Sequence, residues 1–247
     1  MSGPLVVVEG LSIRAPGRML IEDVGLAVHP RRVTALVGPS GAGKSLTARA
    51  CMAVLDVDPG IVAGSLRYPQ LDRDRDWFAD VVGKGMRAQR RLLRRTRHLR
   101  GAYVTYSPQA ASSALNPGRT VGRQLQLAVR RRQEPPASEG RAIAELLDEV
   151  GLSPDTAAAL PGELSGGMAQ RAALAIAIAP LPRMVIADEP ETGLDPVLRR
   201  AVIELLVEVT RSHGAGLLLI SHHESTVDRI ADEVVRLPGA PAARGAA

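Results

Sequence analysis

The stretch GPSGAGKS at positions 38–45 matches the pattern G-x-x-x-x-G-K-[ST] at every fixed position. Its glycines let the backbone turn tightly and point N–H groups inward, where they can bind phosphate oxygens. The lysine can reach the terminal phosphates of a ligand, and the serine hydroxyl after it can bind Mg²⁺. The residues that this pattern predicts to hold the ligand are Gly38, Pro39, Ser40, Gly41, Ala42, Gly43, Lys44, Ser45 and Leu46.

A pair of carboxylates, Asp188 and Glu189, directly follows a second apolar stretch. A carboxylate at this place can hold the hydrated Mg²⁺ whose other protein ligand is Ser45. A second carboxylate one residue later can polarise a water molecule for in-line attack on a terminal phosphate. For a single acidic residue after a strand, the alternative is an ordinary helix cap or surface loop.

Both groups of residues need elements that position them. Residues 33–37 (VTALV) and 183–187 predict short buried strands, and residues 46–55 predict a helix. A glycine-rich turn between a strand and a helix places a bound phosphate at the positive end of the helix dipole. A chance glycine turn is the alternative, and it would not require these neighbours.

Composition limits the fold and the partners. A chain of 247 residues is long enough for one large α/β domain, and an aromatic content of 2% leaves the core to Val, Leu, Ile and Ala. Lysine occurs only at positions 44 and 84, which singles out Lys44. The net charge of +5 would suit nucleic acid or an anionic membrane face. The densest basic stretch, residues 84–100, contains no aromatic residue, which favours a solvated helix face instead.

The cellular compartment is indicated by what the sequence lacks. Cys51 is the single cysteine, which excludes a disulfide framework and suits a reducing compartment. Residues 1–10 lack the basic start and the long apolar region of a signal peptide. No run approaches the roughly 18 apolar residues of a membrane span, so we expect any membrane role to come through partners.

Strand and helix patterns alternate along most of the chain, which predicts a mainly parallel sheet with its site at the strand C-termini. Residues 5–11 and 19–28 predict a small antiparallel sheet beside the main core. The strand pattern disappears over residues 110–180, where helices are expected. Further strands are expected at 64–68, 102–106, 217–220 and 233–237, and helices at 86–98, 121–132, 138–150, 164–179, 196–212 and 224–231.

Residues 164–168, LSGGM, resemble the LSGGQ signature of the ATP-binding cassette (ABC) ATPases. The phosphate loop, Gln109, this signature, Asp188-Glu189, Leu194-Asp195 and His222 follow one another in the family's order. The resemblance implies a single ABC ATPase domain over residues 1–247. It implies an α/β P-loop NTPase core with a mainly parallel sheet and an antiparallel β subdomain (1–109 and 181–237), an inserted α-helical subdomain (110–180) and a flexible tail (238–247).

The resemblance also implies a role for each matching residue. Gln109 would contact Mg²⁺ and the attacking water, Asp188 would hold Mg²⁺, and Glu189 would be the catalytic base. His222 would contact the γ-phosphate of ATP, although a lone histidine at a strand end is more often structural. Asp195 would lie at a dimer seam. The segment that would close on the ATP of a facing subunit is Ser165, Gly166 and Gly167, which open a helix and can present N–H groups to an anion.

Residues 112–117 (SSALNP) and Met168 resemble the peptide and nickel importer branch of this family. The branch implies an energy-coupling subunit that hydrolyses ATP with Mg²⁺ for a binding-protein-dependent importer of peptides, nickel or metal chelates. Its expected partners are two transmembrane permeases, a second ABC ATPase (self or paralogue) in a head-to-tail dimer and, indirectly, an extracytoplasmic substrate-binding protein, with no nucleic acid.

Such a subunit would lie peripherally on the cytoplasmic face of the inner (plasma) membrane. The chain ends at Ala247 without the cysteine-bearing extension of many peptide-type members, which resembles the shorter nickel-type members. Two other functions stay open: a soluble ABC ATPase of a non-transport complex, for example in phosphonate degradation, and a nucleotide-sensing module.

The chain departs from the family pattern at three places. The region that usually stacks an aromatic residue on adenine, residues 12–16, has no aromatic, and Arg14 could stack there by its guanidinium plane. Glu191 replaces a small hydroxyl residue and adds negative charge beside the site. His223 stands where an acidic residue often follows the histidine. These departures predict weak discrimination between ATP and GTP, and could mark a degenerate half of a heterodimer.

Overall fold

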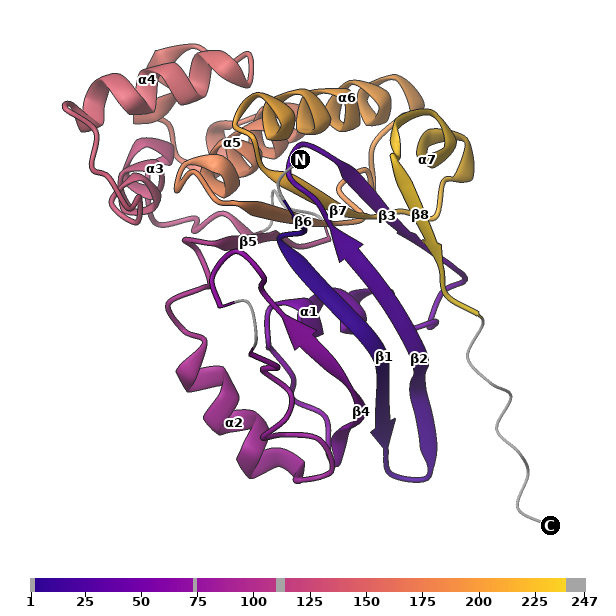
Figure 1. The fold of residues 1–247 in the computed structure, drawn as a ribbon. Coiled ribbons are helices and arrows are strands. Elements are labelled where there is room, and N and C mark those ends of the chain that lie inside the picture. The colour runs from indigo at the N-terminus through magenta and orange to yellow at the C-terminus, as the bar shows by residue number, and fades with distance from the viewer. Residues whose placement is uncertain (1–2, 73–74, 110–113, 239–247) are drawn as a thin grey trace.

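The computed structural model describes residues 3–72, 75–109 and 114–238 (Figure 1). They form a five-stranded parallel sheet in the order β5-β6-β7-β3-β8 and a three-stranded antiparallel sheet in the order β2-β1-β4. The predicted α/β fold with a mainly parallel sheet is therefore confirmed. Residues 239–247 of the predicted tail, and Ser112 and Ser113 of the SSALNP segment, lie outside the described residues.

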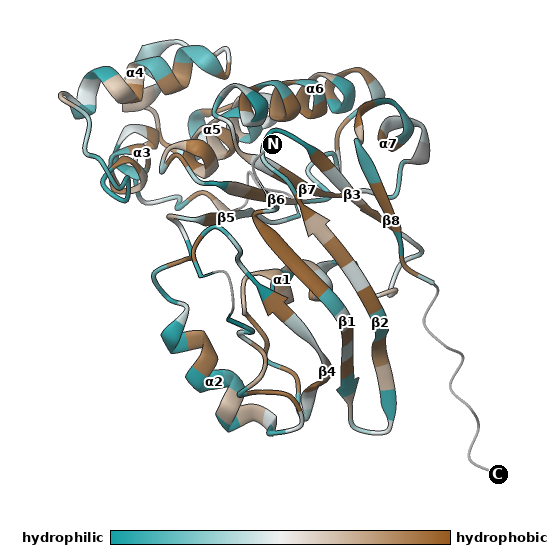
Figure 2. Cartoon of the chain, in the orientation of Figure 1, coloured by the Kyte–Doolittle hydropathy of each residue, from teal (hydrophilic) through white to brown (hydrophobic). Residues whose placement is uncertain are grey.

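The parallel sheet is apolar on both faces because both faces are covered. Met184 and Ile186 join one hydrophobic core, and Val185 and Ala187 join the other, so successive side chains alternate between the two cores. Figure 2 shows the resulting hydrophobic strands in the middle of the molecule. The strands are β5 (Val104–Ser107), β6 (Met184–Asp188), β7 (Gly216–Ile220), β3 (Val33–Val37) and β8 (Glu233–Arg236).

Helices α5, α6 and α7 cover one face of this sheet, and α1 lies on the other face beside the antiparallel sheet (Figure 1). Their bounds are α1 (Lys44–Cys51), α5 (Gly166–Ile178), α6 (Pro196–Ser212) and α7 (Glu224–Ile230). Helix α1 ends four residues before the predicted position 55, because Ala53 adopts a φ of 55° in the left-handed region.

The antiparallel sheet consists of β1 (Val6–Ala15), β2 (Arg18–Val28) and β4 (Gly60–Arg67). A tight turn at Pro16-Gly17 pairs Ala15 with Arg18 and joins the two strands in a hairpin, which confirms the predicted antiparallel sheet. Strand β1 extends beyond the predicted residue 11. Register shifts between Val8 and Leu11 interrupt the alternation of apolar residues there, which explains why the sequence pattern ends too early.

The second hydrophobic core extends into α3 (Val121–Val129) and α4 (Glu139–Glu149), which pack with α5. Side chains cap both helices: Thr120 and Ser138 each accept a hydrogen bond of 3.3 Å from a backbone N–H of the first turn. Helix α2 (Gly85–Arg95) buries Ala88, Gln89 and Leu92 and exposes its arginines, as expected for a solvated basic face. In the described ranges, none of the helices combines the length and the apolar character that a bilayer span requires.

Candidate active site

The C-terminal edge of the parallel sheet collects residues that are far apart in the sequence. The phosphate loop follows β3, Gln109 lies two residues after β5, and Asp188 is the last residue of β6. His222 lies two residues after β7. Because parallel strands end at the same edge, strand order β5-β6-β7-β3 brings these residues together.

The phosphate loop depends on glycine where it turns into α1. Gly43 has a φ of 90°, and a Cβ atom there would lie 2.7 Å from Cγ1 of Ile21. Gly38 has a φ of 153°, and its Cβ would lie 2.8 Å from the carbonyl oxygen of Leu237. A side chain at either position would push the loop away from the strands beneath it, so these two glycines fix the shape of the cradle.

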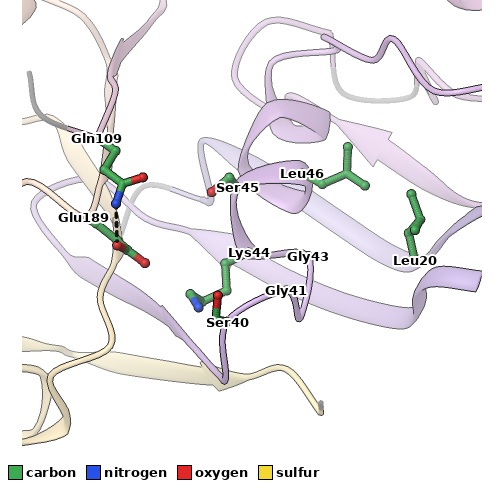
Figure 3. Close-up of a pocket in the computed structure, with 9 residues that line it drawn as sticks. All are labelled: Leu20, Ser40, Gly41, Gly43, Lys44, Ser45, Leu46, Gln109 and Glu189. Atoms are coloured by element: carbon green, nitrogen blue, oxygen red, sulfur yellow. Dashed lines mark hydrogen bonds between the residues drawn. The ribbon is translucent and has the colours of Figure 1, made fainter. Parts of the chain in front are cut away.

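A cavity of about 360 Å³ lies over this loop (Figure 3). Figure 3 shows its polar end, with Gln109 and Glu189, opposite an apolar end formed by Leu20 and Leu46. A cavity of this size, with a polar end and an apolar end, suits a ligand that has a charged part and an apolar part. Its lining residues are Leu20, Ser40, Gly41, Gly43, Lys44, Ser45, Leu46, Gln109 and Glu189.

Lys44 is buried, and its Nζ donates hydrogen bonds to the carbonyl oxygens of Gly38 (2.8 Å) and Pro39 (3.0 Å). Both partners are neutral carbonyl groups, so neither compensates the positive charge of the ammonium. A phosphate group would neutralise that charge, and the turned loop would supply N–H donors around it. The residues present therefore fit the phosphates of a nucleotide.

Asp188 is buried, and its Oδ2 accepts a hydrogen bond of 2.7 Å from the hydroxyl of Tyr106. Burial, followed by this hydrogen bond, raises the pKa of Tyr106 well above its usual range, so the phenol remains a donor at neutral pH. Tyr106 was not predicted as a site residue from the sequence. The signal was its place three residues before Gln109, but the contact depends on the pairing of β5 with β6.

At the polar end of the cavity, Glu189 lies close to two other predicted site residues. Its Oε2 accepts a hydrogen bond of 3.1 Å from Nε2 of Gln109 and lies 3.7 Å from Nδ1 of His222. The backbone of Glu189 has a φ of 46°, which is uncommon for a residue with a side chain, and its N–H donates to the carbonyl of Ile220 at 3.0 Å. Strained residues of this kind cluster at active sites.

The signature segment lies at the start of α5, outside the set of described residues that line the cavity. Ser165 caps the helix by accepting a hydrogen bond of 3.3 Å from the N–H of Met168. A Cβ atom on Gly167 would lie 3.6 Å from Leu198, which places the segment beside the start of α6. Asp195 caps α6 through the N–H groups of Val197 and Leu198, each at 3.0 Å.

Two residues that depart from the family pattern, Arg14 and Glu191, are not among the described residues that line the cavity. Nε of Arg14 lies 3.3 Å from Sδ of Met19, whereas Leu20, which the sequence analysis did not single out, lines the cavity. The hairpin of β1 and β2 thus brings Leu20 of β2, and not Arg14 of β1, to the wall of the cavity. Glu191 does not extend into the cavity but is 1% exposed, and Ser221 donates a hydrogen bond to it.

The sequence profile of the family described as "ABC transporter" matches residues 21–192. The chain therefore belongs to the ABC transporter family, and it is an ATPase of that family. The fold and the phosphate-binding cavity agree with this assignment. The family of the chain was correctly predicted from its signature and its order of motifs.

Relatives with curated names are peptide transport proteins. The dipeptide transport ATP-binding protein DppD of Escherichia coli is 34% identical over 219 residues, which cover 87% of this chain and 62% of DppD. A Brucella ovis protein whose name refers to ATP binding in peptide import is 34% identical over 241 residues, covering 94% of this chain and 68% of that protein. The chain thus spans about two thirds of the length of these relatives.

Solved structures with the same fold are ABC cassettes. A dimeric ATP-binding cassette in a post-hydrolysis state with ADP and phosphate has a TM-score of 0.72 at 19% identity, covering 98% of this chain and 100% of that chain. CbiO1 from Clostridium perfringens, part of an ABC transporter complex, has a TM-score of 0.73 at 19% identity, covering 96% and 85%. At these identities the likeness establishes the P-loop NTPase fold.

Proposed function

We propose that the chain is the ATP-hydrolysing, energy-coupling subunit of a binding-protein-dependent importer for peptides, nickel or metal chelates. One observation carries the proposal: a single cavity brings Lys44, Ser45, Gln109 and Glu189 together in a chain that is 34% identical to DppD. Peptides are the cargo that the names of the relatives support. A soluble ATPase of a non-transport complex remains the alternative, and the relatives do not favour it.

ATP would bind with its phosphates on the loop that ends at Lys44 and Ser45, and with its base toward Leu20 and Leu46. Ser45, Asp188 and Gln109 would hold Mg²⁺, whose chemistry is to neutralise charge on the phosphate oxygens. Leu20 would give the base an apolar contact without hydrogen-bond readout. We therefore keep the expectation of weak discrimination between ATP and GTP.

Glu189 would take a proton from the attacking water, which Gln109 would help to orient. The hydrogen bond of 3.1 Å between these two side chains already places them at the polar end of the cavity. His222 would contact the γ-phosphate. A positioned general base contributes roughly 10²- to 10⁴-fold to such a reaction, so Glu189 is the residue on which turnover should depend most.

The signature residues would complete the site of a facing ATPase in a head-to-tail dimer. Ser165 and Gly166 are exposed at the positive end of α5, beside the cap of α6. The exposed, anion-binding start of α5 supports a surface that the ATP of a partner would cover.

We propose the same partners and place for this subunit as the importer branch implies. It would be a peripheral protein that binds two permeases at the cytoplasmic face of the inner (plasma) membrane. Through them it would interact indirectly with an extracytoplasmic substrate-binding protein. Residues 110–180 would form the helical subdomain inserted into the core of residues 1–109 and 181–237.

Purification of the tagged chain from detergent-extracted membranes of its native host tests this proposal. We expect two multi-span membrane proteins and a second ABC ATPase to be recovered in a fixed ratio. We also expect the ATP hydrolysis of that complex to rise when the substrate-binding protein and its cargo are added. Recovery solely in a soluble complex would overturn the importer proposal in favour of a non-transport ATPase.

A further inference from the structure

A second group of side chains that can bind a metal lies next to Glu189, outside the described residues that line the cavity. Glu191 follows β6, and His222 and His223 follow the neighbouring strand β7. Ligand atoms of these three side chains all lie within 4.8 Å of one another. None of the roles proposed above uses Glu191 or His223.

Only one of the two carboxylate oxygens of Glu191 has a hydrogen-bond partner among the described residues. The side chain is 1% exposed, and Oε1 accepts a hydrogen bond from the hydroxyl of Ser221. Its other oxygen, Oε2, is buried and has no hydrogen-bond partner among the described residues. A buried carboxylate oxygen without a partner is costly, and a bound cation would satisfy it.

The two histidines are placed to join that carboxylate. Their ring centroids are 4.0 Å apart, and the backbone N–H of His223 donates to Oγ of Ser221 at 3.1 Å. A neutral imidazole has one ring nitrogen with a lone pair that can bind a metal.

We propose that Glu191, His222 and His223 form a binding site for a divalent first-row transition-metal ion of the zinc type. Two imidazoles and one carboxylate are a ligand set that zinc uses when a fourth position stays open. Mg²⁺ prefers oxygen ligands, so this site is distinct from the one at Ser45 and Asp188. Ligand bonds of about 2.0–2.2 Å require the three side chains to close together by small rotations.

Charged groups of both signs surround the site. The carboxylates of Glu189 and Glu191 attract a cation, whereas the guanidinium of Arg199 repels it. If the role of His222 at the γ-phosphate is correct, a bound Zn²⁺ withdraws this histidine from ATP. This consequence rests on the proposed function: Zn²⁺ slows ATP hydrolysis and leaves ATP binding intact.

Titration of the tag-free, chelator-treated chain with Zn²⁺ tests the site, in excess Mg²⁺ and without nucleotide. We expect calorimetry to show one ion per chain, and both His223→Ala and Glu191→Gln to weaken its binding at least about tenfold. Glu191→Gln keeps an acceptor for Ser221. The matched control is His213→Ala, because His213 pairs with Glu149 at 2.9 Å in another part of the fold, and it should bind Zn²⁺ as the parent does. No binding by the parent, or unchanged affinity in both site variants, overturns the proposal.

Imidazole NMR signals of the unsubstituted chain give a result that does not depend on how the variants fold. The chain has five histidines, and Zn²⁺ should move the signals of His222 and His223. Movement confined to the other histidines overturns the site. The effect of Zn²⁺ on ATP hydrolysis separates the two proposals. If Zn²⁺ binds without inhibiting hydrolysis, the metal site stands and His222 loses its proposed role at the γ-phosphate. If the chain hydrolyses ATP but does not bind Zn²⁺, the proposed function stands and the metal site is wrong.

Discussion

The side-chain amide of Gln170 donates a hydrogen bond of 2.8 Å to the carbonyl oxygen of Pro190, and both residues are buried. This bond ties α5 to the loop that carries Glu189. The start of α5 presents Ser165 and Gly166 at the surface, whereas Glu189 faces the cavity of its own chain. The bond therefore links the signature segment, which would contact the ATP of a partner, to the loop of Glu189, which would act on the ATP of its own chain.

Gln170→Ala should lower the free energy of unfolding by about 1–3 kcal/mol, because the carbonyl of Pro190 is left buried without its donor. For a chain of this size, each kcal/mol lowers the melting temperature by about 2–4 °C. Calorimetry or circular dichroism measures the change. Gln133→Ala is the matched control, because Gln133 is exposed and its loss should change stability by less than about 0.5 kcal/mol. Equal melting temperatures for the two variants would contradict the role of the bond.

Glu189→Gln should retain ATP binding and reduce turnover by roughly 10²- to 10⁴-fold, since the amide cannot accept the proton of water. With hydrolysis blocked, an ATP-bound dimer should accumulate. Phosphate release measures the first effect, and size-exclusion chromatography with ATP measures the second. Turnover close to that of the parent would remove Glu189 from its proposed role as base.

Lys44→Ala should weaken ATP binding by about tenfold to a hundredfold, the worth of a hydrogen bond to a charged group. Lys84→Ala provides a close control, because the chain has no lysine besides these two and Lys84 is exposed at the start of α2. A nucleotide titration followed by calorimetry compares the variants. If both isotherms matched the parent, the phosphate-loop assignment would be wrong.

Tyr106→Phe should raise the Mg²⁺ concentration that half-maximal ATP hydrolysis requires, by about 10- to 100-fold, because Asp188 loses the donor that orients it. Tyr103→Phe is the control: it also loses a buried hydroxyl, but that hydroxyl donates to the carbonyl of Leu5 at 3.1 Å, away from the cavity. The two variants should differ in Mg²⁺ dependence. A shift of equal size in both would show that packing, not the contact with Asp188, is responsible.

Cys51 should be unreactive in the folded chain. Burial raises the pKa of its thiol from 9.0 to about 12, so iodoacetamide at about pH 8 should label it only after unfolding. The same shift predicts a pH dependence of stability. Below pH 9 the thiol is protonated in both states, whereas between pH 9 and 12 only the unfolded chain loses the proton, which favours unfolding by about 1.4 kcal/mol at pH 10.

Unfolding of the parent and of Cys51→Ala, compared at about pH 8 and pH 10, isolates this contribution. The parent should lose more stability than the variant over that interval. Other buried groups, such as Tyr103, also titrate in alkali, but they contribute equally to both proteins. Parallel pH dependences would show that Cys51 does not carry the effect.

Most elements could be predicted because their signals are local. Helix α6 begins and ends at the predicted residues, since Asp195 caps it and Pro196 fits its first turn. Predictions failed where local pattern competes with tertiary pairing: α1 ends early, before the left-handed residue Ala53, and β1 extends past the irregularity near Gly10. Boundaries of this kind depend on what lies across the sheet, which a single stretch of sequence does not record.

The sequence by itself determined the chemistry of the phosphate loop and the family, because the order of Gly38 to Ser45, Asp188-Glu189 and the signature needs no spatial information. Tertiary structure alone decided three contacts. The pairing of β5 with β6 brings Tyr106 to Asp188, the hairpin brings Leu20 to the cavity, and neighbouring strands bring Glu191 to the histidines. Each contact joins residues from different strands, and register between strands is fixed by the packing of the whole core.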